Sequence, residues 1–288
     1  MTEPTPQQWT GEDLSDREFT AIKELLRDRR QFDLGQYKDR CIRRRIAKRL
    51  RLCKVTNIAS YLSQLERDDN ELDTLLATVS VHVSHFFRNP DTFRILEQKI
   101  LPELCQRVRA VGRTELTLWS VGCASGEEPY SLAMLVDTLA ETGLDMRILA
   151  TDISASVLET ARSGHFEATR MKEVPAAVMK KYFHADNGRY RLIKRVRDKV
   201  EFLRHNIMTA REYPEADLIL CRNVMIYFTR EEQERILSRL AAALPEHGIL
   251  VLGRSETMLD GMRCYYHPEF PVERVYSRTA QPVSAPVD

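Results

Sequence analysis

The feature that most constrains this chain is a glycine turn at residues 122–131 (Gly-Cys-Ala-Ser-Gly-Glu-Glu-Pro-Tyr-Ser). The apolar run 116–121 before it predicts a β-strand. After it, Leu132, Leu135, Val136 and Leu139 recur with the spacing of an amphipathic helix. A strand, a glycine turn and a helix form the unit with which doubly wound α/β domains bind an adenosine cofactor.

The chemistry of this turn argues against a dinucleotide. Gly122 and Gly126 do not have G-x-G-x-x-G spacing, and Glu127 and Glu128 place negative charge where a pyrophosphate requires backbone N–H groups. An acidic turn suits a neutral or cationic ligand. The sulfonium group of S-adenosylmethionine fits that description, so the turn favours this cofactor.

The rest of the chain shows two composition regimes. Residues 12–88 predict a helical domain, with a capping box at Ser15 and Glu18 and amphipathic runs at 37–54, 58–65 and 71–79. Residues 89–278 predict an α/β domain in which strands alternate with helices, typical of a parallel sheet covered by helices. The expected strands are 116–121, 146–150, 200–203, 216–221 and 249–253, and two of the expected helices are 156–162 and 231–244.

The polar segment 165–199 interrupts this alternation. Its Asp186-Asn187-Gly188 turn, followed by alternating residues, predicts an inserted helix and a small antiparallel β-hairpin. The low-complexity ends, 1–11 and 279–288, predict disorder.

Composition excludes several classes of protein. No run approaches the ~18 apolar residues of a membrane helix, and the N-terminus has no signal-peptide segment, so we expect a cytoplasmic protein without membrane insertion. The six cysteines are scattered without a C-x-x-C pair, which predicts reduced thiols and no metal site.

Polar side chains follow the predicted strands at their carboxyl ends, where ligands bind in open α/β sheets. Asp152 is placed to hold a ribose, although it can also simply open the next helix. Asn206 is either a ligand contact or a turn former. Asn223 ends a buried strand abruptly and predicts a position over the ligand.

Two basic features remain. Arg88 follows Phe86-Phe87 at the predicted domain junction, where an arginine can bind a carboxylate through two hydrogen bonds. The run 37–54 holds nine basic residues and one acid, which predicts a docking surface for an anionic partner, either nucleic acid or an acidic protein. Its residues include Arg43, Arg44, Lys48, Arg49 and Arg51.

Taken together, these motifs resemble those of the CheR chemotaxis receptor methyltransferases. The resemblance rests on Phe86-Phe87-Arg88, residues 119–131, Thr151-Asp152 and the run 221–228 (Cys-Arg-Asn-Val-Met-Ile-Tyr-Phe), and it spans about residues 12–278. It implies a class I methyltransferase (Rossmann-like) sheet with a helical N-terminal domain and an inserted β-subdomain. It also implies methyl transfer from S-adenosylmethionine to receptor glutamates, giving glutamate methyl esters and S-adenosylhomocysteine.

The resemblance also implies roles for individual residues. Arg88 and Tyr227 become catalytic residues near the methyl donor. The basic helix becomes the receptor-docking surface, the insert a contact for a receptor tail, and the membrane receptor array the place of recruitment. The implied cofactor contacts are His82, Ser84, Arg88, Gly122, Glu128, Asp152, Asn206, Ile207, Asn223 and Val224.

The chain departs from the family pattern in two places. The family usually has Thr-Asn-x-Thr before Phe-Phe-Arg, and this chain has Val-His-Val-Ser at 81–84. Ser84 keeps a hydroxyl, whereas His82 replaces an amide. The loop between Phe183 and Val200 is short for a member that grips a receptor tail.

Two other functions are compatible with parts of the sequence. A nucleic-acid methyltransferase would use the basic run, but such enzymes commonly carry an Asp/Asn-Pro-Pro-Tyr/Phe loop where this chain has Asn-Val-Met-Ile at 223–226. A cofactor-sensing module without methyl transfer is the other alternative, and the presence of Glu128, Asp152 and Arg88 argues against it.

Overall fold

The computed structural model describes residues 9–10, 13–30, 32–79, 84–139 and 143–281. Contacts divide the chain into two compact units, residues 1–82 with 227–230 and residues 83–226 with 231–288. Among the described residues, no helix has the length and apolar character required to cross a membrane.

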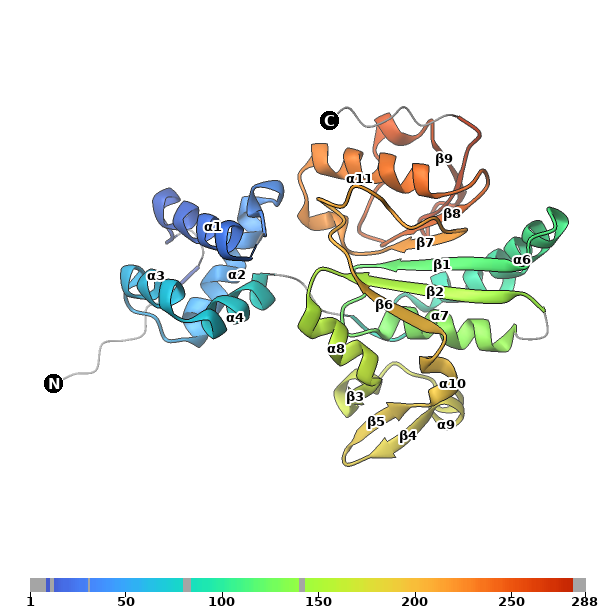
Figure 1. Cartoon of the computed structure of the whole chain (residues 1–288), viewed down its shortest axis with the longest axis horizontal. Coiled ribbons are helices and arrows are strands. Elements are labelled where there is room, and N and C mark those ends of the chain that lie inside the picture. The colour runs from blue at the N-terminus through green and yellow to red at the C-terminus, as the bar shows by residue number, and fades with distance from the viewer. Residues whose placement is uncertain (1–8, 11–12, 31, 80–83, 140–142, 282–288) are drawn as a thin grey trace. The chain divides into compact units, whose positions relative to one another are not determined.

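The smaller unit is helical. Ser15 and Glu18 form the predicted capping box at its first helix, with Ser15 N donating to Glu18 Oε2 (2.9 Å). Asn57 caps the third helix by accepting hydrogen bonds from the next turn. The apolar faces meet in a core that includes Ile22, Ile46 and Leu50. The helices are α1 (Asp16–Arg30), α2 (Asp39–Leu52), α3 (Ile58–Arg67) and α4 (Asp69–Val79), shown in blue and cyan in Figure 1.

The larger unit is built on a seven-stranded sheet with the order β6-β2-β1-β7-β8-β10-β9. Neighbouring strands from β6 to β8 are parallel, as the sequence predicts. The sheet is mixed, because β10 is antiparallel to both β8 and β9. The strands are β1 (Glu115–Val121), β2 (Asp145–Asp152), β6 (Val200–Arg204), β7 (Leu218–Cys221), β8 (Ile249–Leu252), β9 (Tyr266–Phe270) and β10 (Val275–Arg278).

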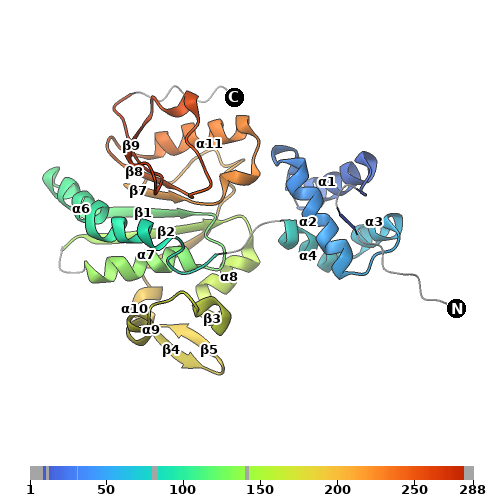
Figure 2. The same cartoon turned by 180° about the vertical axis from the view of Figure 1, so that it is seen from behind.

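Helices cover this sheet, and Figure 2 shows α6 and α7 in front of its central strands. The strand β1 is buried at every position after Glu115, since it lies in the middle of the sheet beneath these helices. The helices of this unit are α5 (Pro90–Ile95), which continues through a π-helical segment (Leu96–Ile100) into α6 (Leu101–Ala110), and α7 (Glu127–Thr138), α8 (Ala155–Ser163) and α11 (Arg230–Ala243).

The insert forms a second, three-stranded antiparallel sheet with the order β3-β5-β4. Its hairpin turns at Asn187 (φ 48°) and Gly188 (φ 77°), the pair of positive φ angles that Asn-Gly favours. The sequence predicts only this hairpin, and β3 is an additional strand. Figure 1 shows the insert beyond the β6 side of the main sheet. It contains β3 (His165–Glu167), a 3₁₀ turn (Ala168–Met171), α9 (Ala176–Tyr182), β4 (Phe183–Asp186), β5 (Arg189–Leu192) and α10 (Lys194–Arg197).

Candidate active site

The candidate site lies where the parallel strands end. Strands β1, β2, β6 and β7 run in one direction, so their carboxyl ends share one edge of the sheet. Gly122 follows β1, Asp152 ends β2, Asn206 comes after β6, and Asn223 comes after β7. The topology therefore brings these four predicted residues to one edge, as the sequence indicates.

Gly122 and the loop after β7 approach each other closely. Gly122 has φ +65°, and a Cβ atom at this position would lie only 2.7 Å from Val224 Cγ2. Any side chain here would strain the backbone and collide with Val224. Two predicted cofactor residues, far apart in the sequence, are thus neighbours.

Asn223 has features of a ligand-binding residue. Its φ of +59° is uncommon for a residue other than glycine. Its side-chain Oδ1 is buried and accepts no hydrogen bond from the described residues. A buried acceptor without a donor is costly unless a ligand or water supplies one. This oxygen therefore fits a hydrogen-bond donor such as the amino group of an adenine.

Asp152 is buried, with 6% of its surface exposed. Its Oδ2 accepts from the backbone N–H of Ala124 in the glycine turn (3.0 Å), and its Oδ1 accepts from Ser154 N (3.0 Å). Ser154 in turn caps α8. The carboxylate therefore fixes the turn and also begins the following helix, the second reading of its sequence position, and its contact with the ribose stays a prediction.

Glu128 is held by two partners, Ser120 in β1 and Arg222 directly after β7. Its Oε1 accepts from Ser120 Oγ (2.8 Å), and its Oε2 accepts from Arg222 Nη1 (3.1 Å). Burial raises the pKa of Glu128, and the nearby Arg222 guanidinium opposes that rise. Sequence reasoning identified Glu128 but missed both partners.

Arg222 also connects this carboxylate to the segment that carries Arg88. Its side chain is 1% exposed. Its Nη2 donates to the backbone oxygen of Arg88 (2.6 Å) and to Asn89 Oδ1 (2.8 Å). The one sequence signal for Arg222 was its position next to Asn223 in the motif 221–228.

A second missed residue, Glu256, organises the loop after β7. Its carboxylate accepts from three backbone N–H groups, those of Gly253 (2.6 Å), Asn223 (2.9 Å) and Met225 (2.8 Å). Glu256 is 4% exposed, and burial raises its pKa. It holds Asn223 in its unusual backbone conformation.

Several predicted residues have other surroundings. Asn206 Oδ1 accepts from Met208 N (3.0 Å), the geometry of a turn former, and Ile207 is buried. His82 lies outside the described residues. Contacts group Tyr227 with the smaller unit, where its backbone oxygen accepts from Lys38 N (2.8 Å), so its role near the donor stays a prediction.

The predicted docking residues of α2 separate into two sets. Arg43 donates to the backbone oxygen of Leu14, Arg49 pairs with the buried Glu71, and Arg51 donates to the backbone oxygen of Trp9. These three therefore also stabilise the helical unit. An exposed stripe with helical spacing also runs along α2 through Arg40, Arg44, Lys48 and Arg51, so Arg51 belongs to both sets.

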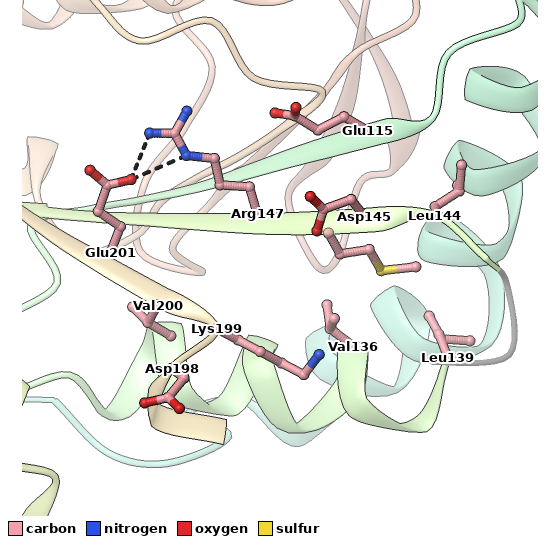
Figure 3. Close-up of a pocket in the computed structure, with 11 residues that line it drawn as sticks. Glu115, Val136, Leu139, Leu144, Asp145, Arg147, Asp198, Lys199, Val200 and Glu201 are labelled. Atoms are coloured by element: carbon pink, nitrogen blue, oxygen red, sulfur yellow. Dashed lines mark hydrogen bonds and ion pairs between the residues drawn. The ribbon is translucent and has the colours of Figure 1, made fainter. Parts of the chain in front are cut away.

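A pocket of about 630 Å³ lies elsewhere in the larger unit (Figure 3). Its lining includes Glu115 at the start of β1, Asp145 at the start of β2 and Val200 at the start of β6. These are the amino ends of the strands, opposite the edge that carries Asp152 and Asn223. The pocket is therefore separate from the candidate site.

The sheet order, with its last strand antiparallel between β8 and β9, and a glycine turn after β1 define a class I S-adenosylmethionine-dependent methyltransferase. Two family models match the chain: "CheR methyltransferase, SAM binding domain" over residues 82–269 and "CheR methyltransferase, all-alpha domain" over residues 17–80. The chain belongs to the CheR methyltransferase family. The S-adenosylmethionine cofactor predicted from the acidic turn is confirmed.

Relatives match over most of the chain. The chemotaxis protein methyltransferase of Listeria monocytogenes is 33% identical over 228 residues, 79% of this chain and 85% of the relative. That of Escherichia coli is 33% identical over 253 residues, 84% of this chain and 85% of the relative. An uncharacterised 104.1 kDa protein of Rhodobacter capsulatus is 36% identical over 241 residues, 83% of this chain but only 25% of that protein.

Among solved structures, the chain is similar to the magnesium protoporphyrin IX methyltransferase of Synechocystis PCC 6803 with bound SAM. The identity is 16%, the TM-score is 0.32, and the match covers 65% of this chain and 79% of that one.

Proposed function

We propose that this enzyme methylates glutamate side chains on the cytoplasmic helices of membrane chemoreceptors. The products are glutamate methyl esters and S-adenosylhomocysteine. The relatives named chemotaxis protein methyltransferases, which match over most of their lengths, support a chemoreceptor as the acceptor. In this proposal the enzyme acts in the cytoplasm and is recruited to receptor arrays.

One observation carries the choice of acceptor, the exposed basic stripe of α2. Arg40, Arg44, Lys48 and Arg51 line one face of this helix. Receptor helices that present clusters of glutamates are acidic, and opposite charges steer such partners together. The insert is proposed as a second contact, for a receptor tail.

The chemistry proposed for the site is an in-line displacement. Bound S-adenosylmethionine supplies an electrophilic methyl group on its sulfonium. A glutamate with a pKa of about 4.3 is already ionised at pH 7, so the acceptor needs no general base. The protein's contribution is to orient the acceptor and remove water from it. Arg222 Nη2 donates to the backbone oxygen of Arg88, and this anchored backbone supports the orienting role that we propose for the Arg88 side chain.

The test of this function is a methanol-release assay. Labelled S-adenosylmethionine is incubated with the protein and receptor-containing membranes, and the product is treated with base. Volatile labelled methanol is expected, since methyl esters are base-labile. Base-stable label in nucleic acid would identify a nucleic-acid methyltransferase, and no label at all would identify a cofactor-binding module. Deleting the receptor tail from the acceptor tests the insert contact, through the KM for the receptor.

Replacing Arg88 with alanine is expected to lower the turnover number at least about tenfold, while S-adenosylhomocysteine affinity stays near the wild-type value. The physical reason is that the proposed main role of Arg88 is to position the acceptor. Steady-state methylation and calorimetry measure the two effects. Unchanged methylation by Arg88→Ala would remove this residue from the catalytic set.

Replacing Asp152 with alanine is expected to weaken cofactor binding by about one to two orders of magnitude. The variant loses the ribose acceptor and also releases the Ala124 N–H that shapes the turn. Calorimetry with S-adenosylhomocysteine measures the loss. Asp145→Ala, at the other end of the same strand, is the matched control, and equal affinities in the two variants would contradict the ribose assignment.

A further inference from the structure

The glycine turn contains a buried acid that the cofactor assignment does not use. Glu127 is fully buried, with 0% of its surface exposed. Its Oε1 accepts from Arg170 Nη1 (3.1 Å) and Ser125 Oγ (3.3 Å). Its Oε2 is buried and has no hydrogen-bond partner among the described residues. Such a carboxylate is costly to bury, so its cationic partner has a large influence on the turn.

The partner, Arg170, comes from the insert. It lies in the 3₁₀ turn at Ala168–Met171, which follows β3. The same Nη1 atom that contacts Glu127 also donates to the backbone oxygen of Ser84 (2.9 Å). One guanidinium therefore joins three segments that are distant in sequence: the insert, the glycine turn, and the segment that leads to Arg88.

Two further residues, Ser131 and Phe86, connect the same three segments. Ser131 Oγ donates to the backbone oxygen of Glu127 (2.6 Å) and accepts from Phe87 N (3.0 Å). The buried Phe86 ring packs edge-on against two rings of the insert, Phe166 (centroids 4.7 Å apart) and Phe183 (5.3 Å). The insert is thus packed against the elements of the active site through both polar and aromatic contacts.

The charge of Arg170 has a direct effect on the buried carboxylate of Glu127. Burial raises the pKa of Glu127, and the Arg170 charge opposes that rise. Arg170 itself keeps 35% of its side chain exposed. Arg170 is thus a partly exposed cation that neutralises a fully buried acid. A change in the insert that moves Arg170 would therefore also affect the glycine turn.

We infer that Arg170 is a positioning residue for methyl transfer, acting through Glu127 on the glycine turn and through Ser84 on the segment of Arg88. The insert therefore sets the geometry of the donor pocket in addition to any part in receptor contact. The effect on cofactor affinity follows from the methyltransferase class alone, and the effect on receptor methylation rests on the proposed function.

The test uses the full chain and four variants. Arg170→Gln removes the charge, Arg170→Lys keeps it, and the double variant Arg170→Gln/Glu127→Gln removes both charges together. Arg189→Gln is the matched control, because Arg189 is an exposed arginine of the same insert whose ion partner is Glu167. Each variant is measured for S-adenosylhomocysteine affinity by calorimetry, for KM and kcat of receptor methylation, and for its thermal unfolding midpoint.

We expect Arg170→Gln to weaken S-adenosylhomocysteine binding about tenfold, because the buried Glu127 charge is left unbalanced. Arg170→Lys should recover most of that loss, and the double variant should bind more tightly than Arg170→Gln. Arg189→Gln should bind as the wild type does. In the methylation assay, Arg170→Gln should raise the KM for S-adenosylmethionine by a similar factor and lower kcat less.

Wild-type affinity in a folded Arg170→Gln variant would overturn the inference. A lower unfolding midpoint of Arg170→Gln without any change in its S-adenosylhomocysteine affinity would also overturn it, since that result would indicate a purely structural role. A wild-type protein that binds S-adenosylhomocysteine but methylates no receptor would refute the proposed function instead. The ranking of the four affinities would then still decide the role of Arg170.

Discussion

Replacing Glu256 with glutamine is expected to lower the free energy of unfolding by about 3 kcal/mol and to abolish measurable cofactor binding. The carboxylate accepts three backbone N–H groups at once, from Gly253, Asn223 and Met225. A glutamine has one acceptor oxygen, and its amide N–H₂ would face at least one of these donors. The Asn223 backbone, held at φ +59°, would lose the contact that fixes it.

Chemical denaturation measures the stability change, and calorimetry with S-adenosylhomocysteine measures binding. Glu246→Gln is the matched control, since the Glu246 side chain is 58% exposed and pairs only with the neighbouring His247 among the described ion pairs. We expect the control to stay within about 0.5 kcal/mol of the wild type. A Glu256→Gln variant as stable as this control would show that the three hydrogen bonds do not hold the loop.

Replacing Arg222 with methionine is expected to cost about 3–5 kcal/mol of stability, the typical effect of removing one partner of a buried ion pair. Among the described residues, Glu128 would keep only its bond from Ser120, and the Arg88 backbone oxygen would lose the hydrogen bond from Arg222. The rate of methyl transfer should also decrease, because Arg222 stabilises both Glu128 in the donor pocket and the backbone of Arg88.

The pH dependence of this variant has a predictable sign. Burial already raises the pKa of Glu128, and loss of Arg222 raises it further. A folded-state pKa above the unfolded value of about 4.3 means that the folded state binds the extra proton. The variant's unfolding free energy should therefore decrease, relative to the wild type, as the pH rises from about 4 towards neutrality.

The controls separate this effect from a general loss of charge. Arg147→Met removes an arginine whose side chain is 50% exposed and whose partner, Glu201, is also on the surface, so about 0–1 kcal/mol is expected. The double variant Arg222→Met/Glu128→Gln should recover part of the lost stability and its pH dependence should be weaker. Equal pH profiles for the single and double variants would contradict the pairing.

The site could be predicted from the sequence where its residues follow strand ends. The shared edge of Gly122, Asp152 and Asn223 can be predicted, because parallel strands bring their carboxyl ends together whatever the loops between them. Glu256 could not be found this way. It lies in a polar loop after β8, and its function depends on hydrogen bonds to residues about thirty positions earlier. Nothing in local composition distinguishes it from a solvated glutamate.

The fold was predictable to a similar extent, and for similar reasons. Long apolar runs such as 116–121 predicted the central strands, because buried parallel strands are continuously hydrophobic. Strand β3 is only three residues long, which is too short for an alternation of apolar and polar residues to be recognised in the sequence. Strand β9 is largely exposed and contains Pro268, so its residues resemble a loop.

The order of the sheet has a consequence for how this enzyme is made. Strand β10 is the last strand along the described chain, yet it lies between β8 and β9. While the ribosome is still translating the segment before Val275, the β8 edge has no partner on its outer side, and β9 has no neighbour at all. A newly made chain thus carries an open hydrophobic sheet edge until Val275–Arg278 has been synthesised, and during that period the edge is exposed to aggregation and to chaperones.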